Sequence, residues 1–132
     1  MMRRILVAAV AYFSVVFSVA FLLGVIRTIW IAPRLGEVAG VLIEGPILVW
    51  ISWVVAGRCI NRFSIPARAL QRLSMGLVAF LLLMAAETAL GTLVFFRPLS
   101  QQLTTYATPA GAIGLLAQVA FGLVPFLRTR GR

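Results

Sequence analysis

Residues 24–53 read GVIRTIWIAPRLGEVAGVLIEGPILVWISW. Two apolar runs in this stretch are joined by the short segment 31–36, IAPRLG, which contains one proline and ends on glycine. Proline is poorly tolerated inside a helix, so Pro33 is expected to end the first helix. A connection of this length allows only a tight reversal of the chain. The stretch therefore predicts an antiparallel helical hairpin.

The same kind of apolar run continues through the rest of the chain. Four runs occupy residues 5–31, 35–57, 73–96 and 110–127. Crossing a hydrocarbon core of about 30 Å takes about 20 helical residues. Inside lipid every backbone polar group must be paired within the protein, which favours helices. We predict one domain, residues 1–132: an all-α membrane protein with four transmembrane helices in an up-down bundle.

Composition points to lipid as the main solvent. Of the 132 residues, 62% are hydrophobic and 11% are charged, whereas a soluble domain is about half apolar and about a quarter charged. The net charge of +9 is compatible with nucleic-acid binding in principle. Nine of the twelve arginines, however, stand at the termini or in short connections beside apolar runs. We therefore expect a lipid bilayer, and not a nucleic acid, as the partner of this charge.

Arginine placement predicts the orientation. On one side of four alternating spans lie Arg3, Arg4, Arg58, Arg62, Arg68, Arg72, Arg128, Arg130 and Arg132. The opposite side has only Arg27, Arg34 and Arg97. Since basic residues are enriched in cytoplasmic segments, both termini are expected inside.

The residues that are missing exclude several kinds of chemistry. Cys59 is the only cysteine and there is no histidine, so an internal disulfide and the usual zinc and haem ligand sets are excluded. No serine–histidine arrangement or phosphate-binding loop is present either. We expect no metal, no cofactor and no enzymatic activity.

The three glutamates are concentrated in the predicted outer half. Counting from the outer ends of their spans, Glu44, Glu87 and Gln118 each lie roughly 12–13 Å deep. Arg27 lies nearer the outer edge. Glu37 and Glu44 share a helix face, since they are seven residues apart. We predict an intramembrane polar cluster of Glu37, Glu44, Glu87, Gln118 and Arg27, with Arg34 and Arg97 as outer-face arginines.

This cluster has two interpretations. Ionisable groups in a membrane usually face an interior and mark a pathway for ions or substrates, so Glu44 and Glu87 are candidates for a proton or cation site. Alternatively, the matching number of arginines indicates a structural network that fixes helix packing. Two neighbouring features also have two interpretations. Pro46 is a tolerated membrane proline, which we favour, or a functional kink. Gly36 and Gly40 pair subunits or pack spans within one chain.

Four short motifs carry a resemblance. They are G-x-x-R at 24–27, P-R-L-G-E at 33–37, E-x-P at 44–46 and T-P-A-G at 108–111. With them the chain resembles a family of small, uncharacterised four-span bacterial inner-membrane proteins. That resemblance implies a multi-pass location in the bacterial inner membrane, and it implies no activity.

The sequence thus predicts a non-enzymatic membrane protein that serves as an accessory or assembly subunit with a buried Arg–Glu–Gln cluster. The alternative is a small proton- or cation-coupled transporter or channel that uses Glu44 and Glu87. Partners beyond the bilayer would be other membrane subunits or further copies of the chain. Paired glutamates without a cavity favour the first function, and a cavity lined by an unpaired glutamate favours the second.

Overall fold

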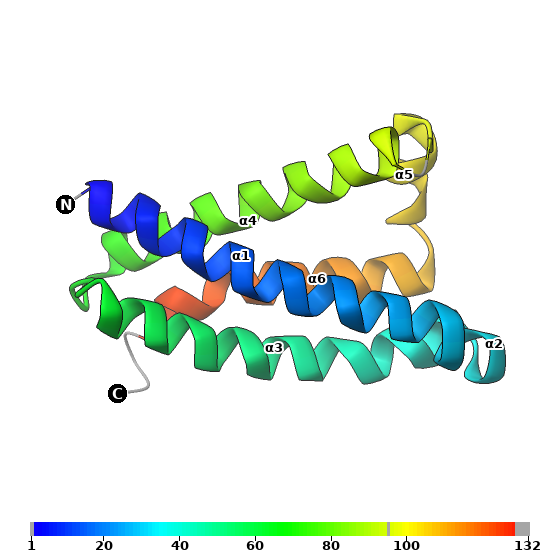
Figure 1. Cartoon of the computed structure of the whole chain (residues 1–132), viewed down its shortest axis with the longest axis horizontal. Helices are drawn as coiled ribbons and strands as arrows, with labels where there is room; N and C mark the ends of the chain where they lie inside the picture. The colour runs from blue at the N-terminus through cyan, green and yellow to red at the C-terminus, as the bar shows by residue number, and fades with distance from the viewer. Residues whose placement is uncertain (1, 95, 129–132) are drawn as a thin grey trace.

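The chain is all-α, as predicted. The computed structural model describes residues 2–94 and 96–128. Its elements are α1 (Met2–Ile26), the π-helical segment η1 (Arg27–Ile31), α2 (Ala32–Leu35), α3 (Glu37–Arg62), α4 (Ala69–Leu93), α5 (Leu99–Thr105) and α6 (Pro109–Leu127). The four long helices pack against each other in a bundle and alternate in direction along the chain (Figure 1).

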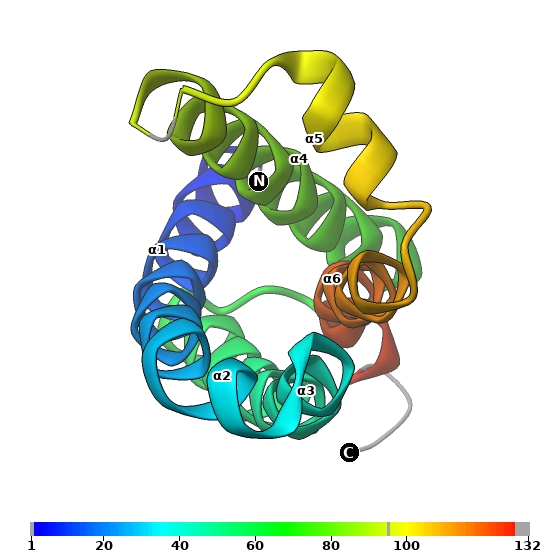
Figure 2. The same cartoon turned by 90° about the vertical axis from the view of Figure 1, so that its right-hand side faces the viewer.

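The long helices form a ring. Helix α1 packs against α3 and α4, and α6 packs against the same two helices. Consecutive helices α3 and α4 consequently lie across the ring from each other (Figure 2). The α1–α3 pair is the hairpin predicted from the short connection.

The described part of the chain contains four helical stretches long and apolar enough to cross a membrane. They are Met2–Leu35, Glu37–Arg62, Ala69–Leu93 and Pro109–Leu127. Large apolar side chains such as Leu22, Trp50 and Leu116 are more than 60% exposed, which suits a surface solvated by lipid. The molecule is a four-span, multi-pass membrane protein.

Several predicted span boundaries differ from the structure: the second span ends at Arg62 in place of Gly57, the third begins at Ala69 in place of Leu73, and two further differences have a clear physical reason. The first span continues past Pro33 to Leu35 through η1 and α2, so the prediction that Pro33 ends the helix is wrong. In η1 the register shifts, and the Ala32 N–H bonds to the Arg27 carbonyl. Pro33 then falls in the first turn of α2, where its missing N–H is not needed. The chain reverses at Gly36, whose φ of 92° favours glycine.

The third span ends earlier than predicted, at Leu93 in place of Phe96. Phe96 has a φ of 53°, outside the helical region, and the Arg97 N–H bonds back to the Gly91 carbonyl. Pro98 disfavours a helical conformation at the residue before it, which gives a physical reason for the early end.

One end of the bundle is tightly packed. This packed half lies where α1 begins and α6 ends (Figure 1). Helices α4 and α6 touch there at Gly76, where a Cβ atom would lie 1.9 Å from the Gly122 carbonyl oxygen. Small side chains such as Ala8, Ala9 and Ala79 are fully buried at the neighbouring contacts. Arg130 and Arg132, which were used to predict orientation, lie outside the described residues.

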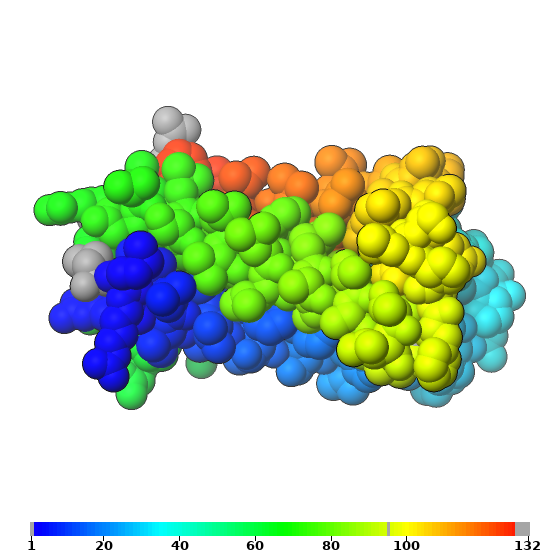
Figure 3. All heavy atoms as spheres, turned by 90° about the horizontal axis from the view of Figure 1, so that it is seen from above, coloured from blue at the N-terminus to red at the C-terminus, as the bar shows by residue number. Residues whose placement is uncertain are grey.

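The opposite end, the α5 end, is more open. Helix α4 leans away from α6 toward this end (Figure 1), and α5 packs against α4. Gly91 makes room for Gln102, since a Cβ atom at Gly91 would meet the Gln102 side chain at 2.6 Å. Figure 3 shows α4 and α5 side by side on the face seen from above.

Candidate functional site: a polar cavity at the α5 end

A cavity of about 700 Å³ lies between the four long helices. This volume is within the range of small-molecule sites, about 300–1,000 Å³. Most of its wall is apolar. Its polar lining residues are Arg27, Thr28, Glu44, Ser52, Glu87, Arg97 and Gln118. The cavity therefore places charged groups from three spans in one apolar chamber.

Arg27 holds two glutamates of α3. Its Nε donates to Glu44 Oε1 at 2.7 Å, and its Nη1 donates to Glu37 Oε2 at 3.3 Å. The Glu44 side chain is 13% exposed, whereas that of Glu37 is 63% exposed. The bond to Glu44 is the shorter and better shielded of the two, so it is the stronger interaction.

Local structure explains how Arg27 reaches α3. It is the first residue of η1, and π-helical turns are often found at functional sites. Gly40 leaves space for its stem, because a Cβ atom at that position would lie 2.8 Å from Arg27 Cγ. Gly40 is therefore used for packing within this chain, beside the span that carries Arg27.

Glu87 has a different partner. Gln118 Nε2 donates a hydrogen bond to Glu87 Oε2, linking α4 to α6. The Gln118 Oε1 atom is buried and has no hydrogen-bond partner. The carboxylate of Glu44 also lies close enough to act electrostatically on Glu87. The two membrane carboxylates thus face one chamber, one held by a guanidinium and the other by a neutral amide.

Tyr106 lies near this site, in the turn between α5 and α6. Burial raises the pKa of its hydroxyl, and the charge of Glu87 raises it further. The electrostatic effect of Glu87 therefore extends to the α5–α6 turn.

The predicted cluster is arranged as two groups. Arg27, Glu37 and Glu44 form one network, and Glu87 with Gln118 forms the other. Four of these five residues line the cavity, whereas Glu37 does not. Of the two outer-face arginines, Arg97 lines the cavity and Arg34 is an exposed residue of α2.

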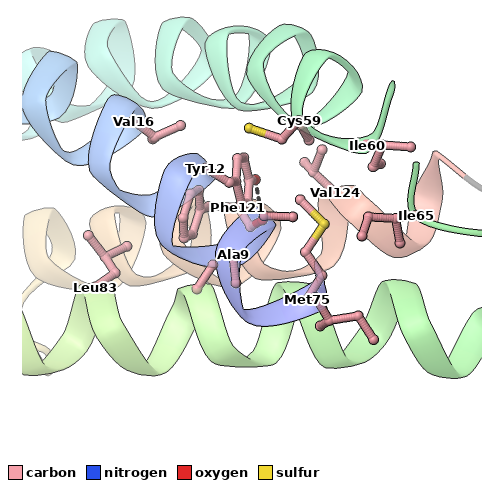
Figure 4. Close-up of a cluster of buried hydrophobic side chains, with 14 residues drawn as sticks. Ala9, Tyr12, Val16, Cys59, Ile60, Ile65, Met75, Leu83, Phe121 and Val124 are labelled. Atoms are coloured by element: carbon pink, nitrogen blue, oxygen red, sulfur yellow. Dashed lines mark hydrogen bonds between the residues drawn. The ribbon is translucent and has the colours of Figure 1, made fainter. Parts of the chain in front are cut away.

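The closed side of the cavity was not predicted. Phe121 and Ser52 line it, and Tyr12 lies directly beyond, stacked on Phe121 with ring centroids 4.4 Å apart. The Tyr12 hydroxyl donates to the Phe121 carbonyl at 2.6 Å (Figure 4). On the side of this contact away from the cavity, the packed half is filled by buried side chains that include Met75, Val124 and Ile60.

The sequence does contain a signal for this contact. Pro125 is four residues after Phe121 and has no N–H, so it cannot supply the normal helical bond to the Phe121 carbonyl. The carbonyl therefore needs another donor, and a tyrosine in a facing span is a suitable one.

Comparison with known proteins gives no match: no family model, no curated protein and no solved structure matches the chain. No family is therefore identified. What can be concluded about function rests on the cavity and the residues that line it.

Proposed function

We propose that this protein is a non-enzymatic membrane transporter that takes up a proton or a cation in the α5-end cavity. The observation that supports this best is the cavity itself, which carries Glu44 and Glu87 between the spans. Ionisable residues inside a membrane commonly mark ion and substrate pathways. A bundle that needed these residues only for packing would not require a chamber of this size.

The carboxylates of the site favour a proton or a cation as cargo. The lining contains two arginines and two glutamates, whose charges sum to zero when all four are ionised. Arg27 is bound by Glu44 and by Glu37, which does not line the cavity. The Glu87 carboxylate accepts its hydrogen bond from a neutral amide, so we propose that it is the group that takes up the proton or the cation.

The two halves of the bundle suggest how transport would proceed. The cavity ends at Phe121 and Ser52, and the packed half beyond them is filled with side chains. We propose that this state of the bundle, which is closed at Phe121 and Ser52, exchanges its cargo at the α5 end. Release at the other end requires the contact between Tyr12 and Phe121 to open.

The proposed orientation follows from the arginines. With both termini in the cytoplasm of a bacterium, the α5 end lies on the outer side of the inner membrane. The protein would then take up its cargo from the outside. We propose further copies of the chain as partners, because four helices enclose only a narrow pathway.

Flux through proteoliposomes tests this function. The purified protein is reconstituted, a pH gradient is imposed, and an entrapped pH-sensitive dye reports proton movement. We expect Glu44→Gln and Glu87→Gln to abolish the flux and Gln101→Leu, an exposed change on α5 outside the cavity, to preserve it. Flux that is equal in all four proteins, or equal to that of empty liposomes, would contradict the proposal.

A second candidate is an accessory subunit of a larger membrane assembly. It is favoured by one observation: both cavity glutamates have hydrogen-bond partners, as expected for a structural network. Native mass spectrometry of the protein extracted from its own membrane distinguishes the two. A stoichiometric complex with another membrane protein supports the accessory function, whereas the chain alone or as a homo-oligomer contradicts it.

A further inference from the structure

Building on the proposed function, we infer that the cavity accepts a protonated primary or secondary amine with an apolar body. Its ammonium group would lie between Glu87 and Gln118, and its apolar part would fill the remaining space. Three features of the chamber lead to this class of ligand: its walls, the difference between its two carboxylates, and the hydrogen-bonding groups beside Glu87.

The walls favour an organic molecule over a bare inorganic ion. Phe17, Phe21, Leu83, Leu90 and Phe121 line the chamber together with smaller apolar residues. Within the described residues, no group of three or more His, Cys, Asp or Glu side chains could hold a metal ion. A chamber of about 700 Å³ with such walls suits a ligand that carries one charge on an apolar body.

The two carboxylates are not equivalent. Glu44 is engaged at 2.7 Å by Arg27, so its negative charge is already opposed by a guanidinium. The hydrogen bond to Glu87 comes from the neutral amide of Gln118, which opposes no charge. A ligand cation therefore gains more by approaching Glu87 than by approaching Glu44.

The number of acceptors beside Glu87 favours an ammonium group that carries N–H bonds. Gln118 Oε1 is buried without a partner, next to the carboxylate that its own Nε2 contacts. A half-turn of the amide exchanges its oxygen and nitrogen. The Gln118 oxygen and the Glu87 carboxylate could then accept from two N–H groups of one ammonium, whereas a quaternary ammonium has no N–H to donate.

Binding measurements with three matched compounds test this inference. The probes are 1-adamantylamine, its N,N,N-trimethyl derivative and 1-adamantanol, which share one apolar body and differ in charge and N–H donors. Calorimetric titration into the purified full-length protein in detergent, with detergent alone as the blank, gives each affinity. We expect the primary amine to bind most tightly and the alcohol most weakly.

Two variants test whether the ammonium group binds to Glu87 and Gln118. We expect Glu87→Gln to weaken 1-adamantylamine by about tenfold or more, as for the loss of a hydrogen bond to a charged group. Gln118→Leu should weaken the primary amine several-fold, and it should leave the trimethyl compound unchanged. Gln101→Leu, outside the cavity, is the matched control and should bind all three probes as the parent does. Circular dichroism verifies that each variant is folded.

Two results would overturn the inference. One is a trimethyl compound that binds as tightly as the primary amine, and the other is an affinity unaffected by both cavity variants. Glu87-dependent proton flux without amine binding above the blank would reject the amine ligand and leave the proposed transport standing. Amine binding that depends on Glu87, in a protein without flux, would reject transport and leave the binding site standing.

Discussion

The packed half and the α5 end use the same small residues in opposite ways. At the packed half, glycine brings two backbones together, since a Cβ atom at Gly76 would meet the Gly122 carbonyl oxygen at 1.9 Å. At the cavity, a Cβ atom at Gly114 would have its nearest neighbour, Val41 Cγ1, at 3.9 Å, an ordinary contact. Gly76 thus permits close helix packing in one half, whereas Gly114 leaves open volume in the other.

The polar side chains of the two halves also differ in their hydrogen-bond partners. In the packed half, side chains satisfy backbone carbonyls, as Tyr12 does for Phe121 and Arg72 does for Ile65 and Pro66. Around the cavity, charged and polar side chains bond to each other across helices. The first arrangement fixes helix positions, whereas the second arrangement can exchange partners with a ligand.

The largest expected effect comes from filling the glycine contact of the packed half. Gly76→Ala forces backbone apart from backbone, so we expect it to lower the free energy of unfolding by at least about 3 kcal/mol, the upper end for overpacking. Titration with sodium dodecyl sulfate, followed by circular dichroism, measures the change.

The matched change at the cavity is Gly114→Ala. It meets only ordinary contacts and replaces glycine by the best helix former, so stability should stay the same or rise by up to about 1 kcal/mol. Equal losses in the two variants would show that the halves do not differ in packing.

The next largest effect is expected at the ion pair of the cavity. Arg27→Met leaves Glu44, 13% exposed, without its guanidinium. Breaking a buried pair costs about 3–5 kcal/mol. Because the Arg27 side chain is itself 25% exposed, we expect Arg27→Met to lower the free energy of unfolding by about 2–3 kcal/mol. The same detergent titration measures it.

The double variant Arg27→Met/Glu44→Gln removes the uncompensated charge and should recover at least half of that loss. Glu87→Gln, whose partner is an amide, should cost much less than Arg27→Met. A double variant as unstable as the single one would show that Arg27 acts through packing alone.

Much of this comparison could be predicted from the sequence, but not all of it. The four spans follow from apolar runs, and the depth count predicts that Glu44, Glu87 and Gln118 lie in one polar layer because rise per residue is fixed. The pairing could not be predicted in that way. Helical phase does not decide whether Arg27 or Gln118 reaches a given carboxylate, and the η1 register shift changes the direction of Arg27.

The cavity also could not be predicted from the sequence. Its volume depends on the divergence of α4 from α6, which starts at the contact of Gly76 with Gly122. Both glycines are visible in the sequence, but nothing in a single sequence shows that they face each other. Gly114 and Gly122 are separated by two steps of four residues on α6, a spacing that predicts a shared side of the helix. In the structure, Gly114 faces the chamber and Gly122 faces Phe80.

A smaller effect is expected at the hydrogen bond that closes the cavity. Tyr12→Phe leaves the Phe121 carbonyl without its donor, which should cost about 1–2 kcal/mol. In a Pro125→Ala background, residue 125 regains an N–H that can bond to this carbonyl, so there the same change should cost less than about 0.5 kcal/mol. An equal cost in both backgrounds would mean that the proline does not create the need for Tyr12.

The smallest effect is expected for an exposed hydroxyl of the same helix that bonds within that helix. The Ser18 hydroxyl donates to the Ser14 carbonyl at 2.8 Å within α1, in an exposed position. That carbonyl can also accept the normal hydrogen bond of the helix backbone, and the additional bond from a serine hydroxyl adds little stability. Ser18→Ala should therefore change the free energy of unfolding by less than about 0.5 kcal/mol. A loss as large as that of Tyr12→Phe would show that any hydroxyl of α1 matters equally. The expected difference between the two instead assigns the stabilisation to the bond that joins α1 to α6 beside the cavity.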